Sequence, residues 1–454
     1  MRNFPAPLWF VKRMMKATLL LLLCVSSARA QIYYPTSDAS WQTTTAAAVG
    51  ADPVLLAEAL TYAQQAKSDS LIILHGGRIL AEQYTGGSSR TTTKKLYSAS
   101  KPMVAALMGK LQSIGEFTSL DQKSAVFIPE WQGVAGKQDI TLRHHLTMTT
   151  GLEGGEQNLF LGAIVKNERN FAVNLPLEHA PGTYWTYNNP AYRLLFSIIE
   201  SATGDTLPNV SAQHLFTPVG MSGASWEVRT TTVGGNTILN YQWVAANALS
   251  AARFGLLALR GGVWNGTQVI PASAISAATA PSQAINPSYG QLWWLNTGAT
   301  DGHQQLFDGV LRAGPYFPDA PPDLFAAIGK DDQIIACIPS LDLVIVRQGT
   351  QPLGVGSEAI SADQNVLFGK IARAFGYAGQ AQPFDLTIAP ISGGVRLSLL
   401  TWFGRSYHIE QSADLGLTPW SNATPAAIAG NGMHATFDHA TTLPRNFYRG
   451  QVVK

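Results

Sequence analysis

Two short motifs in this sequence combine residue types that can carry out nucleophilic chemistry. Ser98 and Lys101 form a Ser-x-x-Lys motif, and Tyr187 and Asn189 form a Tyr-x-Asn motif. Residues three apart share a face on the first turn of a helix, so the Ser98 hydroxyl and the Lys101 amine would meet. A hydroxyl beside an amine that can take its proton is a plausible nucleophile, and free N–H groups at the helix start could stabilise an oxyanion. The alternative is a capping serine followed by a solvated lysine.

The segments around both motifs predict how they are held. A core-facing helix follows the first motif, with Ser98 at its N-cap position and Gly115 at its C-cap. The apolar face of this helix consists of Val104, Leu107, Met108 and Leu111. The second motif lies on a turn-rich loop, residues 181–190, that leads into a predicted helix over 191–202.

Length and composition indicate a folded protein with more than one domain. The chain has 454 residues, of which 46% are hydrophobic and 13% are charged. The net charge of +2 is too small to indicate a nucleic-acid partner. Beyond the N-terminal segment, no stretch is long and apolar enough to span a membrane, so we expect no membrane span in the mature chain.

Residues 1–30 have the pattern of a signal peptide. Basic residues precede an apolar segment over 17–25, and Ala28-Arg29-Ala30 has the small-x-small form of a cleavage site. We therefore expect a mature chain that begins near Gln31 and is secreted or periplasmic.

Hydrophobic patterns predict a sheet assembled from both ends of the main domain beside a mostly helical middle. The predicted strands are a hairpin over 71–82 and the segments 292–295, 324–328, 334–338 and 343–347. The predicted helices cover 52–63, 140–152 with its end at Gly151, 191–202, 251–258 and 362–375. This order indicates an α+β fold with a helical subdomain.

The composition changes after Gly376. Residues 380–383 look like a linker, and the short alternating runs in 384–454 predict a separate small β-sandwich. We divide the chain into the signal peptide, a main domain over 31–379 and an accessory module over 380–454. The accessory module could bind glycan or the cell surface, or stabilise the rest of the chain.

Together and in this order, the two motifs resemble those of the serine β-lactamase and penicillin-binding DD-peptidase group. The resemblance is to the class C-like branch, which includes esterases and amidases, and it spans roughly residues 41–375. Its other matching segments are 140–152, Arg253-Phe254-Gly255 and the strands around 339–343. The resemblance implies a β-lactamase-like antiparallel sheet flanked by helices, a small ester, amide or peptide as substrate, and no metal or cofactor.

The resemblance also implies a role for each motif residue. Ser98 would be the acylated nucleophile, and Lys101 would share its proton. Tyr187 would act as general base or acid, and Asn189 would hold the substrate amide and order Lys101. Burial can lower a lysine pKa, and a tyrosine held between cations can lose its proton. Otherwise Tyr187 would be a turn aromatic packed on Trp185, and Asn189 a turn former.

A third motif of the group departs from its usual form. Relatives carry Lys-Thr-Gly or His-x-Gly at this point, whereas this chain has Ala327-Ile328-Gly329. Gly329 would let a substrate backbone approach closely, and the N–H of Lys330 would be the second oxyanion donor beside that of Ser98. Ala327 lacks a cation or imidazole, which disfavours β-lactam recognition. The Lys330 side chain either replaces that charge or is an ordinary turn lysine.

The sequence as a whole predicts an exported serine hydrolase that cleaves an ester or amide through a Ser98 acyl-enzyme. The open alternatives are a cell-wall DD-peptidase, a β-lactamase, and a binding protein on an inactive hydrolase scaffold. His144 and His145 lack metal-binding spacing, so we expect one to be packed and the other exposed.

Overall fold

A computed structural model describes residues 32–155, 165–298, 302–353, 360–382, 386–414, 419–424, 426–441 and 446–453. The predicted signal peptide, residues 1–30, lies outside these ranges. Within them, no helix combines the length and apolar character that crossing a membrane requires.

A six-stranded antiparallel sheet forms the centre of the main domain, in the order β2-β1-β13-β12-β11-β8. Its strands are β1 (Ser68–His75), β2 (Arg78–Tyr84), β8 (Trp294–Leu295), β11 (Phe325–Gly329), β12 (Gln333–Ile338) and β13 (Leu343–Gly349). β1 pairs along its length with β13, which confirms that distant segments of the chain build one sheet. All residues of β11, β12 and β13 are buried, which suits central strands covered on both faces.

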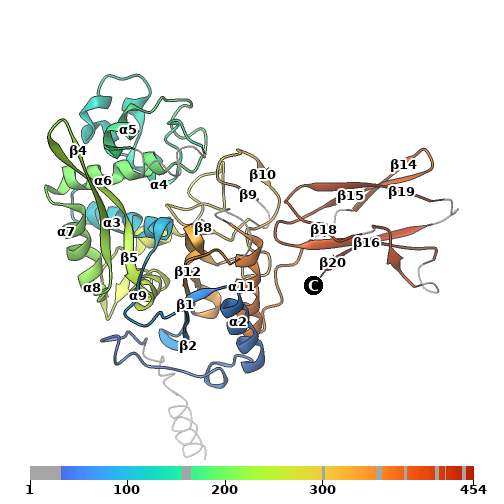
Figure 1. Cartoon of the computed structure of the whole chain (residues 1–454). Coiled ribbons are helices and arrows are strands. Elements are labelled where there is room, and N and C mark those ends of the chain that lie inside the picture. The colour runs from blue at the N-terminus through green and yellow to red at the C-terminus, as the bar shows by residue number, and fades with distance from the viewer. Residues whose placement is uncertain are drawn as a thin grey trace, which may run out of the picture. The chain divides into compact units, whose positions relative to one another are not determined.

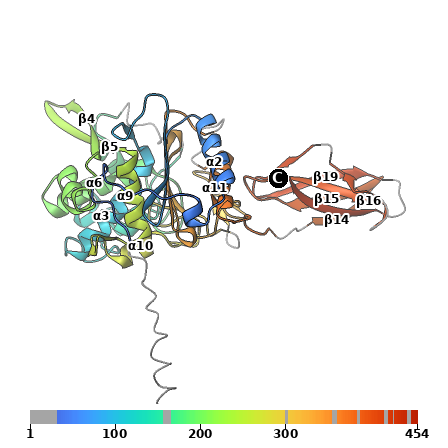
Figure 2. The same ribbon diagram turned by 90° about the horizontal axis from the view of Figure 1, so that it is seen from below.

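Helices cover both faces of this sheet (Figures 1 and 2). α2 (Pro53–Gln65) and α11 (Ala362–Ala374) pack together on one face, and α9 (Ala248–Leu259) packs on the other. Asp52 caps α2, because its carboxylate accepts from the N–H groups of Val54 and Leu55. α9 approaches the sheet closely, since a Cβ on Gly255 would lie 2.5 Å from Cγ1 of Val344.

The remaining helices form the predicted helical region. They are α3 (Lys101–Ser113), α4 (Leu142–Leu146), α5 (Glu168–Asn174), α6 (Asn189–Thr203), α7 (Leu207–Ser211), α8 (Thr217–Val219) and α10 (Ala272–Ala278). The predicted apolar face of α3 is fully buried. α4 is shorter than predicted: it ends at Leu146 instead of Gly151, because the chain turns into a left-handed conformation at Met148 (φ 58°).

A second sheet lies in this mostly helical region and was not predicted. β3 (Thr93–Lys95), β4 (Ser225–Val233) and β5 (Asn236–Asn247) form a three-stranded antiparallel sheet. Gly234 and Gly235 both have positive φ in the turn between β4 and β5, so this turn depends on glycine. The Gly-Gly pair between β-branched residues was the available signal for this hairpin.

Short elements connect the larger ones. The turn Asn265-Gly266, with both residues at positive φ, joins β6 (Val263–Trp264) to β7 (Thr267–Gln268), and β9 (His303–Gln304) pairs with β10 (Leu311–Arg312). The 3₁₀ helices are Ala47–Val49, Tyr97–Ser100, Ser124–Val126, Pro129–Trp131, Lys137–Asp139, Lys330–Asp332 and Pro339–Leu341, and a π-helical turn spans Ala212–Phe216.

Residues after 385 form two further sheets. One contains β14 (Leu386–Ile391), β15 (Gly394–Leu400) and β19 (His434–Ala440). The other contains β16 (Ser406–Ser412), β17 (Ser421–Asn422), β18 (Ile428–Ala429) and β20 (Phe447–Val453). Leu397 and Leu399 from the first pack with Tyr407 and Ile409 from the second in one core, as in a small sandwich. The domain boundary at residue 380 stays a prediction.

Candidate active site

Ser98 lies in the 3₁₀ helix Tyr97–Ser100, immediately before α3. The prediction that it caps the helix is wrong, because α3 begins at Lys101 and Ser100 occupies the N-cap position. The hydroxyl of Ser100 accepts from the N–H of Val244 on β5, at 2.8 Å. The sheet of β3, β4 and β5, which was not predicted, therefore holds the segment that carries Ser98. The Ser98 hydroxyl itself has other partners.

The Lys101 amine donates to Ser98 Oγ at 2.8 Å. Lys101 is only 5% exposed, and its Nζ lies 4.8 Å from the ring centre of Tyr187 and 4.7 Å from that of Tyr192. Burial lowers the pKa of Lys101 well below its ordinary value, and the positive charge of Arg193 lowers it further. The neutral amine is therefore favoured, and a neutral amine beside a hydroxyl can accept its proton.

Tyr187, from the second motif, lies close enough to Ser98 for the two side chains to interact, and this interaction lowers the pKa of Tyr187. Its ring stacks on that of Trp294, with centroids 5.7 Å apart. Burial raises the pKa of Tyr187 above its ordinary value. The interaction with Ser98 and the positive charge of Arg193 lower the pKa, but by less than burial raises it. The phenol is thus held in its neutral form, which corrects the expectation of a tyrosine that readily loses its proton.

Backbone contacts fix the loop that carries Tyr187. The N–H of Tyr187 donates to the carbonyl of Leu306 at 3.0 Å, and the Asn188 side chain caps α6 by accepting from the N–H of Ala191. Asn189 is the first residue of α6 and is partly exposed. Its predicted contact with the substrate amide stays a prediction.

Gly329 ends β11 directly against the segment that carries Ser98. A Cβ at this position would lie 2.2 Å from the carbonyl oxygen of Leu96 and 3.1 Å from the Ser98 nitrogen. Glycine is therefore needed here for contact with the protein's own backbone, whereas the sequence suggested contact with a substrate. Lys330 follows, with an exposed side chain whose Nζ lies 3.1 Å from a carboxylate oxygen of Asp331, as an ordinary turn lysine would.

These contacts bring Ser98, Lys101 and Tyr187 together and place Gly329 beside them. Residues 54–361 match the family described as Beta-lactamase, which is more than half of the chain. The chain belongs to the beta-lactamase family. This membership supports the serine hydrolase class predicted from the two motifs.

Individual relatives of this beta-lactamase family member are named for other activities. A D-aminopeptidase of Cereibacter sphaeroides (strain KD131) is 25% identical over 166 residues, which cover 34% of this chain and 31% of the relative. The chain thus matches less than a third of that enzyme's length. Two solved structures share the fold at 16% sequence identity. One is a penicillin-binding protein from Bacillus halodurans, with a TM-score of 0.51 and a match that covers 69% of this chain and 98% of that one. The other is EstCE1, a hydrolase with promiscuous acyltransferase activity, with a TM-score of 0.52 and a match that covers 71% of this chain and 98% of that one.

Further residues near the site of this beta-lactamase family member were not predicted from the sequence. Tyr192 and Arg193 lie on the first turns of α6, close enough to Lys101 for the ring contact and charge effect described above. Arg193 forms an ion pair with buried Glu168, which also accepts from Arg229 at 3.0 Å. The spacing of Tyr192, three residues after Asn189, was the only signal that it would share a helix face with the motif.

Two further predictions concern residues away from this centre. His145 is fully buried, with Nδ1 2.7 Å from the carbonyl oxygen of Ala191, so it is packed as predicted. His144 is half-buried rather than exposed, because its Nδ1 accepts from the N–H of Thr141 in a capping box. In the described part of the chain, no group of three or more His, Cys, Asp or Glu side chains is arranged to hold a metal ion.

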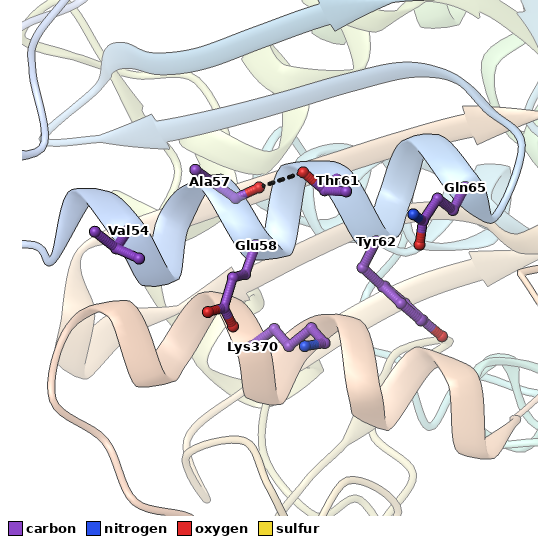
Figure 3. A pocket seen from close by; sticks show the side chains of 7 residues that line it. All are labelled: Val54, Ala57, Glu58, Thr61, Tyr62, Gln65 and Lys370. Carbon is purple, nitrogen blue, oxygen red and sulfur yellow. Dashed lines mark hydrogen bonds between the residues drawn. The ribbon is translucent and has the colours of Figure 1, made fainter.

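A hollow of about 400 Å³ lies between α2 and α11 (Figure 3). It is lined by Val54, Ala57, Glu58, Thr61, Tyr62, Gln65 and Lys370. Its hydroxyls have internal partners: Thr61 donates to the carbonyl of Ala57, and Tyr62 donates to the carboxylate of Asp363 at 3.0 Å. None of the predicted site residues lines it, so the candidate active site is the cluster around Ser98.

Proposed function

We propose that this enzyme cleaves an amide or ester through a covalent acyl-enzyme on Ser98. The observation that carries the proposal is the buried Lys101 amine, which lies 2.8 Å from Ser98 Oγ and whose pKa is lowered by burial. The Tyr187 phenol, whose pKa responds to the Ser98 side chain, supplies a second proton-transfer group. A hydroxyl with both partners has the arrangement of an activated nucleophile.

The proposed reaction has two stages. As Ser98 Oγ attacks the substrate carbonyl, its proton passes to neutral Lys101, and the N–H groups of Ser98 and Lys330 stabilise the oxyanion. Collapse of the tetrahedral intermediate breaks the bond to the leaving amine or alcohol. This leaving group receives a proton from the neutral Tyr187 phenol, and Lys101 then returns its proton to Tyr187. Water then attacks the ester carbonyl and gives a proton to neutral Lys101, which passes it to Ser98 Oγ as the ester C–O bond breaks, so that the acid and free Ser98 are released.

We propose an amide of a D-amino acid as the first substrate class to test. The D-aminopeptidase relatives support this choice: the match covers 34% of this chain for the enzyme described above and 29% for the one from Brucella canis. Ala327, which is 1% exposed, offers no charge to a β-lactam carboxylate. We therefore place β-lactams behind D-amino-acid amides and simple esters.

We also propose that the enzyme is exported. The basic, apolar and small-x-small pattern of residues 1–30 supports cleavage before Gln31 and a secreted or periplasmic mature enzyme. N-terminal sequencing of protein from the culture medium or periplasm tests it: an intact Met1 would contradict export by this route. Binding of glycan by residues 380–454 remains a separate proposal, tested by co-sedimentation with cell-wall glycan.

Labelling with a fluorophosphonate probe tests the nucleophile. We expect one adduct on the wild-type protein, mapped to Ser98 by peptide mass spectrometry, and none on Ser98→Ala. Ser113→Ala is the matched control, because Ser113 lies at the other end of α3 and its hydroxyl donates to the carbonyl of Lys110; this variant should still be labelled. An unlabelled, folded wild-type protein that also hydrolyses no D-alanine p-nitroanilide, p-nitrophenyl acetate or nitrocefin would favour the inactive-scaffold alternative.

A further inference from the structure

The turn between β11 and β12 has an unusual backbone conformation. Asp331 (φ 60°) and Asp332 (φ 52°) are consecutive residues other than glycine, and both are left-handed. Such residues are disfavoured by contacts of their own Cβ, so two in a row persist only where surrounding structure holds them. The turn directly follows Gly329, which borders the segment that carries Ser98, and Lys330.

One buried guanidinium holds this turn. Arg347 on β13 is 0% exposed, and its Nη1 donates to the carbonyls of Asp331 and Asp332. Its other nitrogens donate outside the turn, to Ser68 Oγ at 3.0 Å and to the carbonyls of Ala66, Lys67 and Gln351 at 3.2, 3.3 and 2.9 Å. Arg347 therefore ties the turn to the start of β1 and to the segment after β13.

The side chain of Asp332 completes the restraint. It is 4% exposed, and its two carboxylate oxygens accept from the N–H of Leu353 and from Nε2 of Gln364, both at 2.6 Å. Gly349 leaves room for the guanidinium, because a Cβ there would lie 2.5 Å from Arg347 Nη2. Backbone and side chain of the turn are thus fixed from three segments.

We propose that Arg347 and Asp332 are positioning residues that set the Lys330 N–H against Ser98. The inference rests on the proposed function, in which this N–H stabilises the oxyanion. Gly329 packs closely against the Leu96 carbonyl and the Ser98 nitrogen, so a displacement of the turn would also displace the backbone beside the nucleophile. The hydrogen bonds of Arg347 go to the turn, to residues 66–68 and to Gln351, so Arg347 acts on the transition state through the turn.

Arg347→Lys tests the proposal, because lysine keeps the charge but cannot span six acceptors. We expect kcat for p-nitrophenyl acetate to fall about 10- to 100-fold, as for a misplaced catalytic group, with KM changed less than about threefold. Arg253→Lys is the matched control. Arg253 is also buried and bonds Asp38 and the carbonyls of Pro35 and Val219, so its loss should lower Tm with kcat within about twofold.

The outcomes separate this inference from the proposed function. If the wild type is neither labelled nor active, the proposed function fails. If the wild type is labelled and Arg347→Lys keeps the kcat of Arg253→Lys, only the positioning role is overturned. If Arg347→Lys does not fold, Asp332→Asn decides: a fall in kcat of at least about fivefold at constant KM supports the role, and an unchanged kcat overturns it.

Discussion

At the scale of single residues, burial gives the two proton-transfer groups opposite pKa shifts and the same charge state. It lowers the pKa of Lys101 and raises that of Tyr187, so both are favoured as neutral groups. A neutral amine can take a proton and a neutral phenol can donate one. The two roles, which the sequence left open for Tyr187, follow from how little water reaches either side chain.

Lys101→Arg should abolish this function of the amine. A guanidinium stays protonated and cannot accept the Ser98 proton, so we expect the rate of fluorophosphonate labelling to fall about 10²- to 10⁴-fold. Lys110→Arg, at the other end of α3, is the control and should be labelled at the wild-type rate. Equal labelling of both variants would exclude Lys101 as the base.

Burial of Lys101, and after it the charge of Arg193, should set the acid limb of the pH–rate profile. Activity rises with pH as Lys101 loses its proton, and Arg193 lowers the pKa of Lys101. Arg193→Gln removes that repulsion, so the acid limb should move to higher pH. Arg169→Gln removes an exposed partner of Glu130 instead and should leave the profile in place. A shift to lower pH in Arg193→Gln would contradict this assignment.

At the scale of elements, the site depends on close contact between backbones of distant segments. β11 ends against the Tyr97–Ser100 helix at Gly329, and β5 bonds Ser100 from another side. Local patterns predicted α2, α6, α9, α11 and the hairpin β1–β2 because periodicity, caps and turn glycines are short-range signals. They missed the β4–β5 sheet and overextended α4, where tertiary contacts compete with helix propensity.

Gly329→Ala should show how tight the contact at β11 is. A methyl group 2.2 Å from the Leu96 carbonyl forces the backbones apart, so we expect a loss of about 1–3 kcal/mol of stability together with slower labelling of Ser98. Urea unfolding and labelling rates measure the two effects. Gly266→Ala, in a hairpin turn with open space around its Cβ, should cost stability without changing labelling. Normal labelling in Gly329→Ala would mean that the strand can retreat without disturbing Ser98.

At the scale of the whole molecule, buried neutral groups link folding to pH. Burial lowers the pKa of His145 and of His303 from 6.5 to about 4. Between pH 6.5 and 4 the unfolded chain therefore binds more protons at these positions than the folded one does. Stability contributed by the two neutral rings is complete above pH 6.5 and declines as the pH falls towards 4.

His145→Gln should weaken this pH dependence. A shift from 6.5 to about 4 corresponds to at most about 3 kcal/mol for one histidine, so the variant should lose less stability than the wild type between pH 7 and 4.5, although it starts from a lower value. Urea unfolding at several pH values provides the measurement. His434→Gln, at an exposed position on β19, is the control and should follow the wild-type curve. Identical slopes for all three proteins would exclude His145 as a cause of acid sensitivity.

By itself, the sequence determined the two motifs, the elements that carry them and the departure at Ala327, because these depend on residue type and short spacing. Only the tertiary structure decided that Lys101 lies between two tyrosine rings, that Gly329 is needed against Leu96, and that Arg347 holds the turn after β11. The physical reason is that burial and backbone contact arise when segments far apart in the chain pack together. The loss of water around an amine or a phenol, which sets its charge, is a property of that packing and has no local pattern.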